Sequence, residues 1–536
     1  FGSRPLATGL ATGARSMQDG GAVSRRSASR GRAVALLCVC TALLLERAAT
    51  KSSPSTVREA DHWPHSRGHV GSYSRSRLRG PRNLSDAFLW KWHHPVDRYR
   101  TIITGGVIFD QSNNIYLTTE AGVWKFSPTG AVVWFHFCKD MGPIPSAVSI
   151  NEGRIFGSTQ EGWVFCLKMT SGEEIWRVKR GDNTPGDTHY VEAYKGVVVC
   201  GFDADYSRDG GAKRVFGLNT TDGAKLWEFV PDIVSWNFQA QFASDGESFV
   251  FEDIVGRGYR LGAKDGRLIW KSGPGTFVEG SFTDGGALLD EDLGMVFTVA
   301  ATVPGHLWRA DTPGVIFALN FTDGSLIWKQ PTARIPNSWP VVGPLQKGAK
   351  PSVVIPEGKQ GAMPILLMLS NVRWVPDKIK LALHNFSLWL GDYQMSFWRY
   401  LLPDFLVDPM PLDIEAFDAA TGARQWKWQG PIHRRIACGG DEEGVVTRLT
   451  LGIRGLCWPG PWSAPTIDAD GTVYVGAQNG DFVALWDGNG DGKIDDATEV
   501  SKFDTGASAL HPGPALVPGL LAYPTCDGLF VFKAPS

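Results

Sequence analysis

The sequence predicts an all-β fold built from repeats, because a turn containing glycine, followed by a strand that ends in tryptophan, recurs along the chain. Two clear copies are Thr-Asp-Gly-Ala-Lys-Leu-Trp at 221–227 and Thr-Asp-Gly-Ser-Leu-Ile-Trp at 322–328. Repeats of roughly 40–50 residues are typical of propellers and other repeat arrays. The tryptophans of this pattern are Trp134, Trp176, Trp227, Trp270, Trp328 and Trp426.

Each repeat contains the elements of a four-stranded antiparallel blade. Residues 462–485 show this best, with an apolar strand, an Asp-Gly hairpin turn at 470–471, a second strand, an Asn-Gly turn at 479–480 and a third strand. Glycine adopts positive φ at such turns without steric cost. The large apolar side chain of the tryptophan then suits it to packing between neighbouring blades.

These repeats resemble those of pyrroloquinoline-quinone (PQQ) type β-propellers, which place Thr-Gly-x-x-x-Trp across the outer strands. The resemblance covers residues 88–534. Counting the outer strands, with Trp92 in one and Lys502-Phe503 in another, gives eight blades. The C-terminal residues supply three strands of the last blade, and we expect residues 88–92 to add the fourth and close the ring.

Composition indicates a globular protein, with 43% apolar and 20% charged residues among 536. The net charge of −2 gives no reason to expect nucleic acid as a partner. Residues 1–50, with Met17 as the expected start, carry arginines followed by a short apolar run at 33–45. This layout predicts a signal peptide, or alternatively a short membrane anchor or an organelle-targeting leader. We therefore expect a secretory, lumenal or extracellular location.

Two segments outside the repeats are also assigned. Residues 51–87, rich in Ser, Arg and Gly, are expected to form a flexible linker before a propeller at 88–536. The long interval at 341–413 is expected to be an insertion in blade 6, with an amphipathic helix at 376–390. We interpret this insertion as a decoration packed on the propeller. The alternative is a lid, a partner surface or a membrane contact made by residues 376–403.

The cysteines and glycosylation sequons bear on the compartment. Cys438 and Cys457 flank one irregular loop and are candidates for a disulfide, whereas Cys166 and Cys200 are expected to be buried free thiols. Four Asn-x-Ser/Thr sequons would be usable in a secretory lumen. They lie at Asn83, Asn219, Asn320 and Asn385.

A calcium-type loop is predicted at 487–499, where Asp-Gly-Asn-Gly-Asp-Gly-Lys-Ile-Asp follows the oxygen-ligand spacing of EF-hand loops. Thr498 occupies the twelfth position, where a bidentate Glu normally lies, and the acid follows one residue later. We interpret the loop as a structural calcium site, and the alternative is a metal-free Gly/Asp hairpin. The candidate ligands are Asp487, Asn489, Asp491, Lys493 through its carbonyl, Asp495 and Glu499.

The resemblance implies a second possible cofactor, because enzymes of this family hold the quinone on the propeller axis. Their site also has a calcium ion, an aspartate base, a tryptophan below the ring and a disulfide between adjacent cysteines. This chain has no adjacent cysteine pair. Its candidate channel-lining residues are aromatic, amide and imidazole side chains. They are His189, Trp236, Gln239, Trp339, Trp462 and His511.

Two functions from different classes therefore stand. The first is a binding or interaction scaffold that holds a protein or small molecule on one propeller face. The second is a PQQ-dependent dehydrogenase that oxidises an alcohol or a sugar, so the sequence alone leaves enzyme activity undecided. No dinucleotide fingerprint, P-loop, GxSxG or HExxH motif is present.

Overall fold

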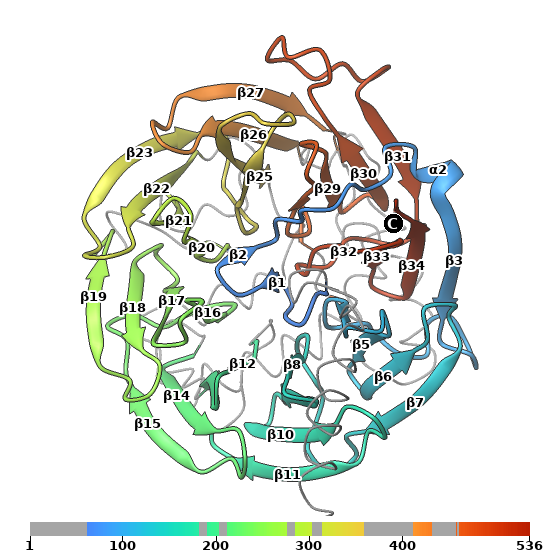
Figure 1. Cartoon of the computed structure of the whole chain (residues 1–536), viewed down its shortest axis with the longest axis vertical. Coiled ribbons are helices and arrows are strands. Elements are labelled where there is room, and N and C mark those ends of the chain that lie inside the picture. Colours follow the sequence, from blue (N-terminus) through green and yellow to red (C-terminus); the bar gives the residue numbers. More distant parts are fainter. Residues whose placement is uncertain are drawn as a thin grey trace, which may run out of the picture. The chain divides into compact units, whose positions relative to one another are not determined.

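Antiparallel pairing of consecutive strands builds eight blades arranged in a ring (Figure 1). In this computed structural model, the described residues are 62–181, 190–202, 212–275, 283, 285–302, 313–358, 411–430, 432, 457 and 460–535. They belong to a unit that begins at Val57. The predicted eight-bladed, all-β propeller is confirmed.

Each of the first four blades runs from an innermost to an outermost strand. Blade 1 contains β4 (Ile108–Phe109), β5 (Ile115–Thr119), β6 (Gly122–Phe126) and β7 (Val132–Phe137). Blade 2 contains β8 (Ser149–Asn151), β9 (Arg154–Ser158), β10 (Trp163–Lys168) and β11 (Glu174–Lys179). Blade 3 contains β12 (Glu192–Tyr194), β13 (Val197–Phe202), β14 (Arg214–Asn219) and β15 (Lys225–Phe229). Blade 4 contains β16 (Gln241–Phe242), β17 (Ser248–Glu252), β18 (Gly258–Gly262) and β19 (Leu268–Ser272).

Blades 5 to 7 follow the same order. Blade 5 contains β20 (Leu288–Asp290), β21 (Met295–Ala301), β22 (Gly314–Asn320) and β23 (Leu326–Thr332). Blade 6 contains β24 (Val341–Pro344), β25 (Pro351–Gly358), β26 (Leu412–Asp418) and β27 (Arg424–Gln429). Blade 7 contains β28 (Thr466–Ile467), β29 (Val473–Gly476), β30 (Asp481–Leu485) and β31 (Val500–Asp504).

Blade 8 closes the ring as predicted. Its inner strands come from the C-terminal end of the chain and its outer strand, β3 (Phe88–His93), comes from far earlier in the sequence. β3 pairs antiparallel with β34, so the two ends of the propeller are joined by backbone hydrogen bonds. The C-terminal strands are β32 (Ala515–Val517), β33 (Leu520–Pro524) and β34 (Gly528–Lys533).

The repeated tryptophans lock adjacent blades together. Each indole lies against the positive-φ glycine of the outer turn in the next blade, so closely that an added Cβ would meet the ring at 2.6–3.0 Å. Several indole N–H groups also donate to a carbonyl of that turn, as Trp328 does to Ala419 at 2.9 Å. The tryptophan–glycine pairs are Trp90–Gly130, Trp134–Gly172, Trp176–Gly223, Trp227–Gly266, Trp270–Gly324 and Trp328–Gly422.

In blade 8 the repeat tryptophan is Trp90, so the assignment of Trp92 to that role is wrong. Trp90 lies over Gly130 and its N–H donates to the Pro128 carbonyl at 3.3 Å. Trp92 packs instead against Trp124, with ring centroids 5.1 Å apart. Trp90 and Trp92 are two residues apart on one strand, so the sequence does not distinguish their roles. The contact with Gly130 in the next blade identifies Trp90 as the repeat tryptophan.

The insertion in blade 6 is narrower than 341–413. β24 and β25 are regular strands of the blade, so the extra residues lie between Gly358 and Leu412, that is, between its second and third strands. The predicted helix at 376–390 and the segment 376–403 lie outside the described residues. A search of the described helices found none long and apolar enough to cross a bilayer.

Residues 62–87 do not form the flexible linker that was predicted for 51–87. They form β1 (Gly68–His69), β2 (Ser72–Tyr73) and α2 (Leu84–Ala87), and this N-terminal segment runs from the centre of the ring to its rim (Figure 1). Trp63, Tyr73 and Leu84 are buried. The spread of these apolar anchors along a polar stretch explains why composition alone indicated a linker.

The N-terminal segment contacts every blade. β2 pairs with β20 and extends blade 5 into a six-stranded sheet. Further backbone hydrogen bonds join the segment to blades 1, 2 and 7, and its side chains contact blades 3, 4, 6 and 8. In blade order, the contacts are Trp63 with Phe109, Pro64 with Ile150, His65 with Glu192, Tyr73 with Phe242, Ser72 with Asp290, Arg67 with Pro340, Ser74 with Ile467, and Leu84 with the cluster containing Leu516 and Leu521.

The tryptophan–glycine contact yields a matched pair of variants. Gly422 and Gly348 share a φ near +75°, but only Gly422 has a ring against it, since the space around Gly348 is open. We expect Gly348→Ala to lower the free energy of unfolding by about 1–2 kcal/mol through the left-handed backbone alone. Gly422→Ala should cost about 1–3 kcal/mol more, because Trp328 must move. Denaturant unfolding of both variants measures the two free energies. Equal losses would contradict a stabilising contact between Trp328 and Gly422.

Candidate functional site

Side chains of the N-terminal segment and of several blades meet near the axis of the ring. From the N-terminal segment, buried His65 binds buried Glu192 through Nδ1 and Oε2, which are 2.6 Å apart. Gln239 donates from Nε2 to Ser66 Oγ at 2.6 Å and to Glu192 Oε1 at 3.2 Å. These four side chains form a buried polar network that joins the N-terminal segment to the loops and strands of blades 3 and 4.

A second group surrounds Trp339, which lies in the loop before β24. The Arg67 guanidinium lies 5.7 Å from the centroid of its ring and donates to the Pro340 carbonyl at 2.8 Å. Tyr190 and His511, from the loops before β12 and β32, meet the same indole at centroid distances of 5.8 and 6.1 Å. Side chains from well-separated blades therefore converge on one tryptophan.

Burial sets the electrostatics of this group. Removal from water lowers the pKa of Arg67 to about 9. Burial also lowers the pKa of His511 to about 4, so its imidazole is neutral at pH 7. The group is held by cation–π, aromatic and hydrogen-bond contacts between its described residues.

Several buried polar atoms around the axis have no hydrogen-bond partner among the described residues. Buried donors and acceptors normally find one, so such atoms indicate places for water or a small polar ligand. Beside Trp339 these atoms are both ring nitrogens of His511, Nε1 of Trp339 and Oγ of Ser338. The axis therefore combines tight packing with unmet hydrogen-bonding capacity.

The predicted channel residues divide into three groups. Trp339 and His511 meet on the axis, and Gln239 belongs to the Glu192 network. Trp462 instead donates to the Glu357 carbonyl at 3.0 Å and packs on Trp428 between blades 6 and 7, while half-buried Trp236 packs against a small cluster at Val234, Ile254 and Val255. His189 lies outside the described residues.

Sequence reasoning missed four axial residues: His65, Arg67, Tyr190 and Glu192. The first two were missed because residues 51–87 were assigned to a linker. The signal that could have found them is the spacing of Trp63, Tyr73 and Leu84, large apolar residues that a linker has no reason to carry.

The loop at 487–499 is arranged around its own carboxylates. Asp487 accepts the backbone N–H groups of Gly490 and Gly492 at 2.7 and 3.1 Å. Glu499 accepts those of Gly488 and Asn489 through Oε1 and that of Asp495 through Oε2, which draws both arms of the loop together. Among the described residues, no three His, Cys, Asp or Glu side chains are grouped as metal ligands.

This loop also replaces the usual outer turn of blade 7. Among the described residues, no turn glycine lies over the Trp426 ring and no group partners its Nε1, whereas Trp428 donates to Asp496 Oδ1 at 2.6 Å. Gln346 of blade 6 donates to the Asp487 carbonyl at 3.0 Å. The contacts between blades 6 and 7 therefore depend on the shape of the loop.

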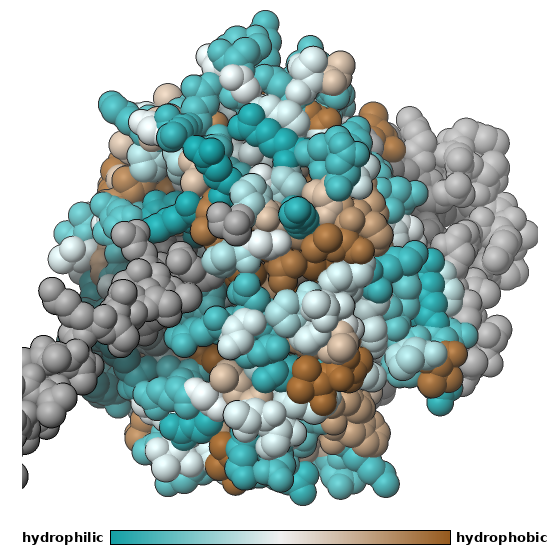
Figure 2. Space-filling model, turned by 45° about the vertical axis from the view of Figure 1, so that its right-hand side comes forward, coloured by the Kyte–Doolittle hydropathy of each residue, from teal (hydrophilic) through white to brown (hydrophobic). Residues whose placement is uncertain are grey.

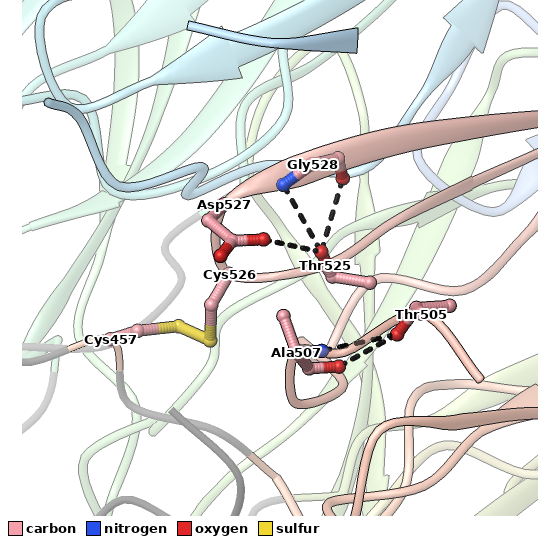
Figure 3. Close-up of a disulfide and its surroundings, with 7 residues drawn as sticks. All are labelled: Cys457, Thr505, Ala507, Thr525, Cys526, Asp527 and Gly528. Carbon is pink, nitrogen blue, oxygen red and sulfur yellow. Dashed lines mark hydrogen bonds between the residues drawn. A yellow bond between two sulfur atoms is a disulfide. The ribbon is translucent and has the colours of Figure 1, made fainter. Parts of the chain in front are cut away.

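The disulfide joins Cys457 to Cys526, so the predicted pairing of Cys438 with Cys457 is wrong (Figure 3). Cys526 follows β33 in the turn where Thr525 Oγ1 accepts the Gly528 N–H at 3.1 Å, and this turn holds the cysteine in place. The bridge ties the loop between blades 6 and 7 to blade 8. Cys166 and Cys200 are buried free thiols, as predicted, and Cys138 is a third.

The closed ring of eight four-stranded blades defines the chain as a β-propeller. Its repeats are of the PQQ type: a family model described as outer membrane protein assembly factor BamB matches residues 211–343, which confirms the resemblance seen in the sequence. No curated protein matches the chain at the sequence level.

Solved structures extend this likeness over most of the chain. Quinohemoprotein alcohol dehydrogenase ADHIIG from Pseudomonas putida HK5 has a TM-score of 0.54 at 9% identity, covering 89% of this chain and 80% of that one. The enzyme from Comamonas testosteroni has a TM-score of 0.53 at 11% identity, with coverages of 89% and 81%. A europium-containing methanol dehydrogenase has a TM-score of 0.52 at 11% identity, with coverages of 89% and 98%. At these identities the likeness shows the fold alone.

The buried His511 makes stability depend on pH. Its folded pKa of about 4 lies below the usual 6.5, so the unfolded chain binds more protons between these values and stability falls as the pH falls through them. The His511 imidazole should therefore lower the free energy of unfolding by about 2 kcal/mol at pH 5 relative to pH 7. We expect His511→Phe and His511→Asn, neither of which titrates there, to lose less stability over that interval. Unfolding at both pH values measures this, and an unchanged loss in both variants would contradict it.

Proposed function

We propose that this propeller is a binding scaffold that holds a partner or small polar ligand on one face of the ring. The observation that carries the proposal is the packing near the axis, where the N-terminal segment and the Trp339 group lie in the place where the resemblance to PQQ-type enzymes leads us to expect the quinone. The unpartnered polar atoms around His511 suit water or a small ligand.

The face we propose for binding carries the loops that precede the innermost strands. The N-terminal segment pairs near the other ends of these strands, at Phe109, Asp290 and Ile467, and covers them. The loops before β12, β24 and β32 carry Tyr190, Trp339 and His511 at the opposite ends. Loops on a rigid scaffold commonly carry recognition.

The described axial residues do not fit pyrroloquinoline quinone. The chain has no adjacent cysteines, and the part of it that the structure describes offers no three-ligand acidic group for an accompanying ion. Arg67, Tyr190 and His511 pack against Trp339 where a planar ring would need an open face. We therefore keep PQQ-dependent dehydrogenase activity as the second candidate function. A direct experiment distinguishes it from the binding scaffold.

Reconstitution supplies that experiment. The full chain is incubated with pyrroloquinoline quinone and calcium, and its absorbance and its reduction of an artificial electron acceptor with alcohols and sugars are recorded. We expect neither a bound-cofactor spectrum nor turnover, because Arg67, Tyr190 and His511 already pack against Trp339. A cofactor spectrum with substrate-dependent dye reduction would establish the dehydrogenase and end the scaffold proposal.

The positive arm of the same experiment is capture of a ligand or partner by the full chain. A partner on the proposed face should bind Trp236→Ala at least several-fold more weakly, because this half-buried indole lies in the loop before β16. Leu326→Lys, on the outer strand β23, should leave binding unchanged. A partner affected only by the outer-strand variant would place recognition elsewhere.

A secretory or extracellular compartment is part of this proposal. The disulfide between Cys457 and Cys526 supports an oxidising environment. Asn83, in one of the sequons, is exposed at the start of α2. Cleavage of the leader and occupancy of the sequons belong to the same expectation.

Calcium in the 487–499 loop is a further element of the proposal. The ion would take oxygens of Asp487, Asn489, Asp491, Asp495 and Glu499 and the Lys493 carbonyl, with Gly492 at the sharp turn that EF-hand loops require. Bound there, it would neutralise the acidic loop and hold the contact between Trp428 and Asp496.

We expect calcium to raise the melting temperature of the full chain and EDTA to lower it. Asp491→Ala should reduce the calcium-dependent rise and weaken calcium affinity at least tenfold, since it removes a central ligand. Asp245→Ala is the control, because Asp245 likewise accepts a backbone N–H in a turn but lies outside the loop. Calorimetry that finds equal calcium affinity in parent and Asp491→Ala would refute the site.

A further inference from the structure

The outer strand of blade 1, β7, presents an apolar edge. It is the last strand of its sheet, so one side of its backbone has no neighbouring strand within the blade. Val133, Phe135 and Phe137 alternate along one face and are 50%, 39% and 56% exposed. Exposed edge strands of this kind are templates for pairing with another chain.

The other seven outer strands carry a charge where β7 carries Phe135. This position directly follows the repeat tryptophan of each outer strand, or Phe503 in β31. All seven residues are exposed. They are Lys91 in β3, Arg177 in β11, Glu228 in β15, Lys271 in β19, Lys329 in β23, Lys427 in β27 and Asp504 in β31. Charges at edges suppress sheet-to-sheet association, so blade 1 alone lacks this protection among the outer strands.

Aromatic side chains extend the apolar surface around β7. Phe135 stacks on Trp124 of β6 with centroids 4.2 Å apart, and Trp92 of β3 lies 5.1 Å from Trp124. Phe137 continues the row at 6.3 Å from Phe135. Figure 2, turned so that the β3 side of the ring comes forward, shows hydrophobic areas on this face of the molecule.

We propose that β7 pairs antiparallel with β7 of a second copy of this chain, joining two blades into one continuous sheet across a twofold axis. A register centred on Phe135 places it opposite its own counterpart and places Val133 opposite Phe137 of the second copy. All side chains on the exposed face of the joint are then apolar, and each cross-strand pair is favourable. The interface is isologous, as twofold dimers require.

Charge favours a second copy of this strand as the occupant. In the proposed register the first charged residues beyond β7, Lys139 and Asp140, face Ala131 and Gly130, so no like charges meet. Self-pairing of β19, β23 or β27 in the equivalent register would set lysine against lysine. Among the outer strands, β7 is therefore the one whose pairing with itself meets no repulsion at this position.

The small area of the proposed interface limits the affinity of the dimer. Six residues on each side, with the flanking Trp92 and Trp124, form a small interface compared with the roughly 1,200–2,000 Å² of stable complexes. We therefore expect a reversible dimer that forms at micromolar concentration.

The experiment measures the mass of the full chain by sedimentation over a concentration series. The parent should shift from monomer to dimer, and Phe135→Lys, which installs the charge found at this position in β19, should raise the dissociation constant at least tenfold. Leu326→Lys, which charges an exposed leucine on β23, is the matched control and should dimerise like the parent. A parent that stays monomeric up to ~100 μM, or a Phe135→Lys variant that dimerises normally, would overturn the proposal.

Mixing complementary variants tests the register and excludes misfolding as the cause. Phe135→Lys and Phe135→Glu should each remain monomeric alone and form a heterodimer when mixed, because residue 135 faces itself across the twofold axis. Recovery of the dimer on mixing supports the proposed register. Failure of the mixture to associate would overturn the pairing centred on Phe135.

Discussion

Contact between a tryptophan of one blade and a turn glycine of the next is the interaction on which the ring depends. A blade is a single twisted sheet that buries little by itself, so its neighbours must supply the core. The indole fills the space between sheets at the rim, and glycine allows it to approach because any Cβ would strike the ring. Both residues are therefore required at every junction where they occur, and the sequence repeats them together.

Neighbouring segments also supply the packing at the centre of the ring. The N-terminal segment runs through the centre of the ring before the chain proceeds to β3 (Figure 1). One piece of chain thus bonds to all blades and also supplies the closing strand. Buried charges such as Arg67 and Glu192 are tolerated because each is paired or stacked.

The fold could be predicted from the sequence because its determinants are local and repeated. Turn glycines and tryptophans report eight blades and the closing strand without reference to distant residues. The axis is a different case, since Arg67 meets Trp339 across 272 positions of sequence and His65 meets Glu192 across 127. The disulfide followed the same rule: proximity in sequence favoured Cys438, whereas the fold brings Cys526 beside Cys457. Contacts of this kind carry no periodic signal.

The unpartnered polar atoms beside Trp339 mark a place where water or a small polar ligand can bind. A buried donor or acceptor without a partner costs about 1–3 kcal/mol, and an apolar side chain of similar size would avoid that cost. The blades show that the chain can pack apolar residues tightly, as it does throughout the interblade clusters. His511 and Trp339 keep unpartnered nitrogen atoms near the axis, and indole nitrogens between blades, as in Trp124, Trp134 and Trp426, also lack a partner among the described residues. A water cluster or small polar ligand held beside His511 and Trp339 would offset this cost, and this is the part of the axis where the proposed binding role is to be tested.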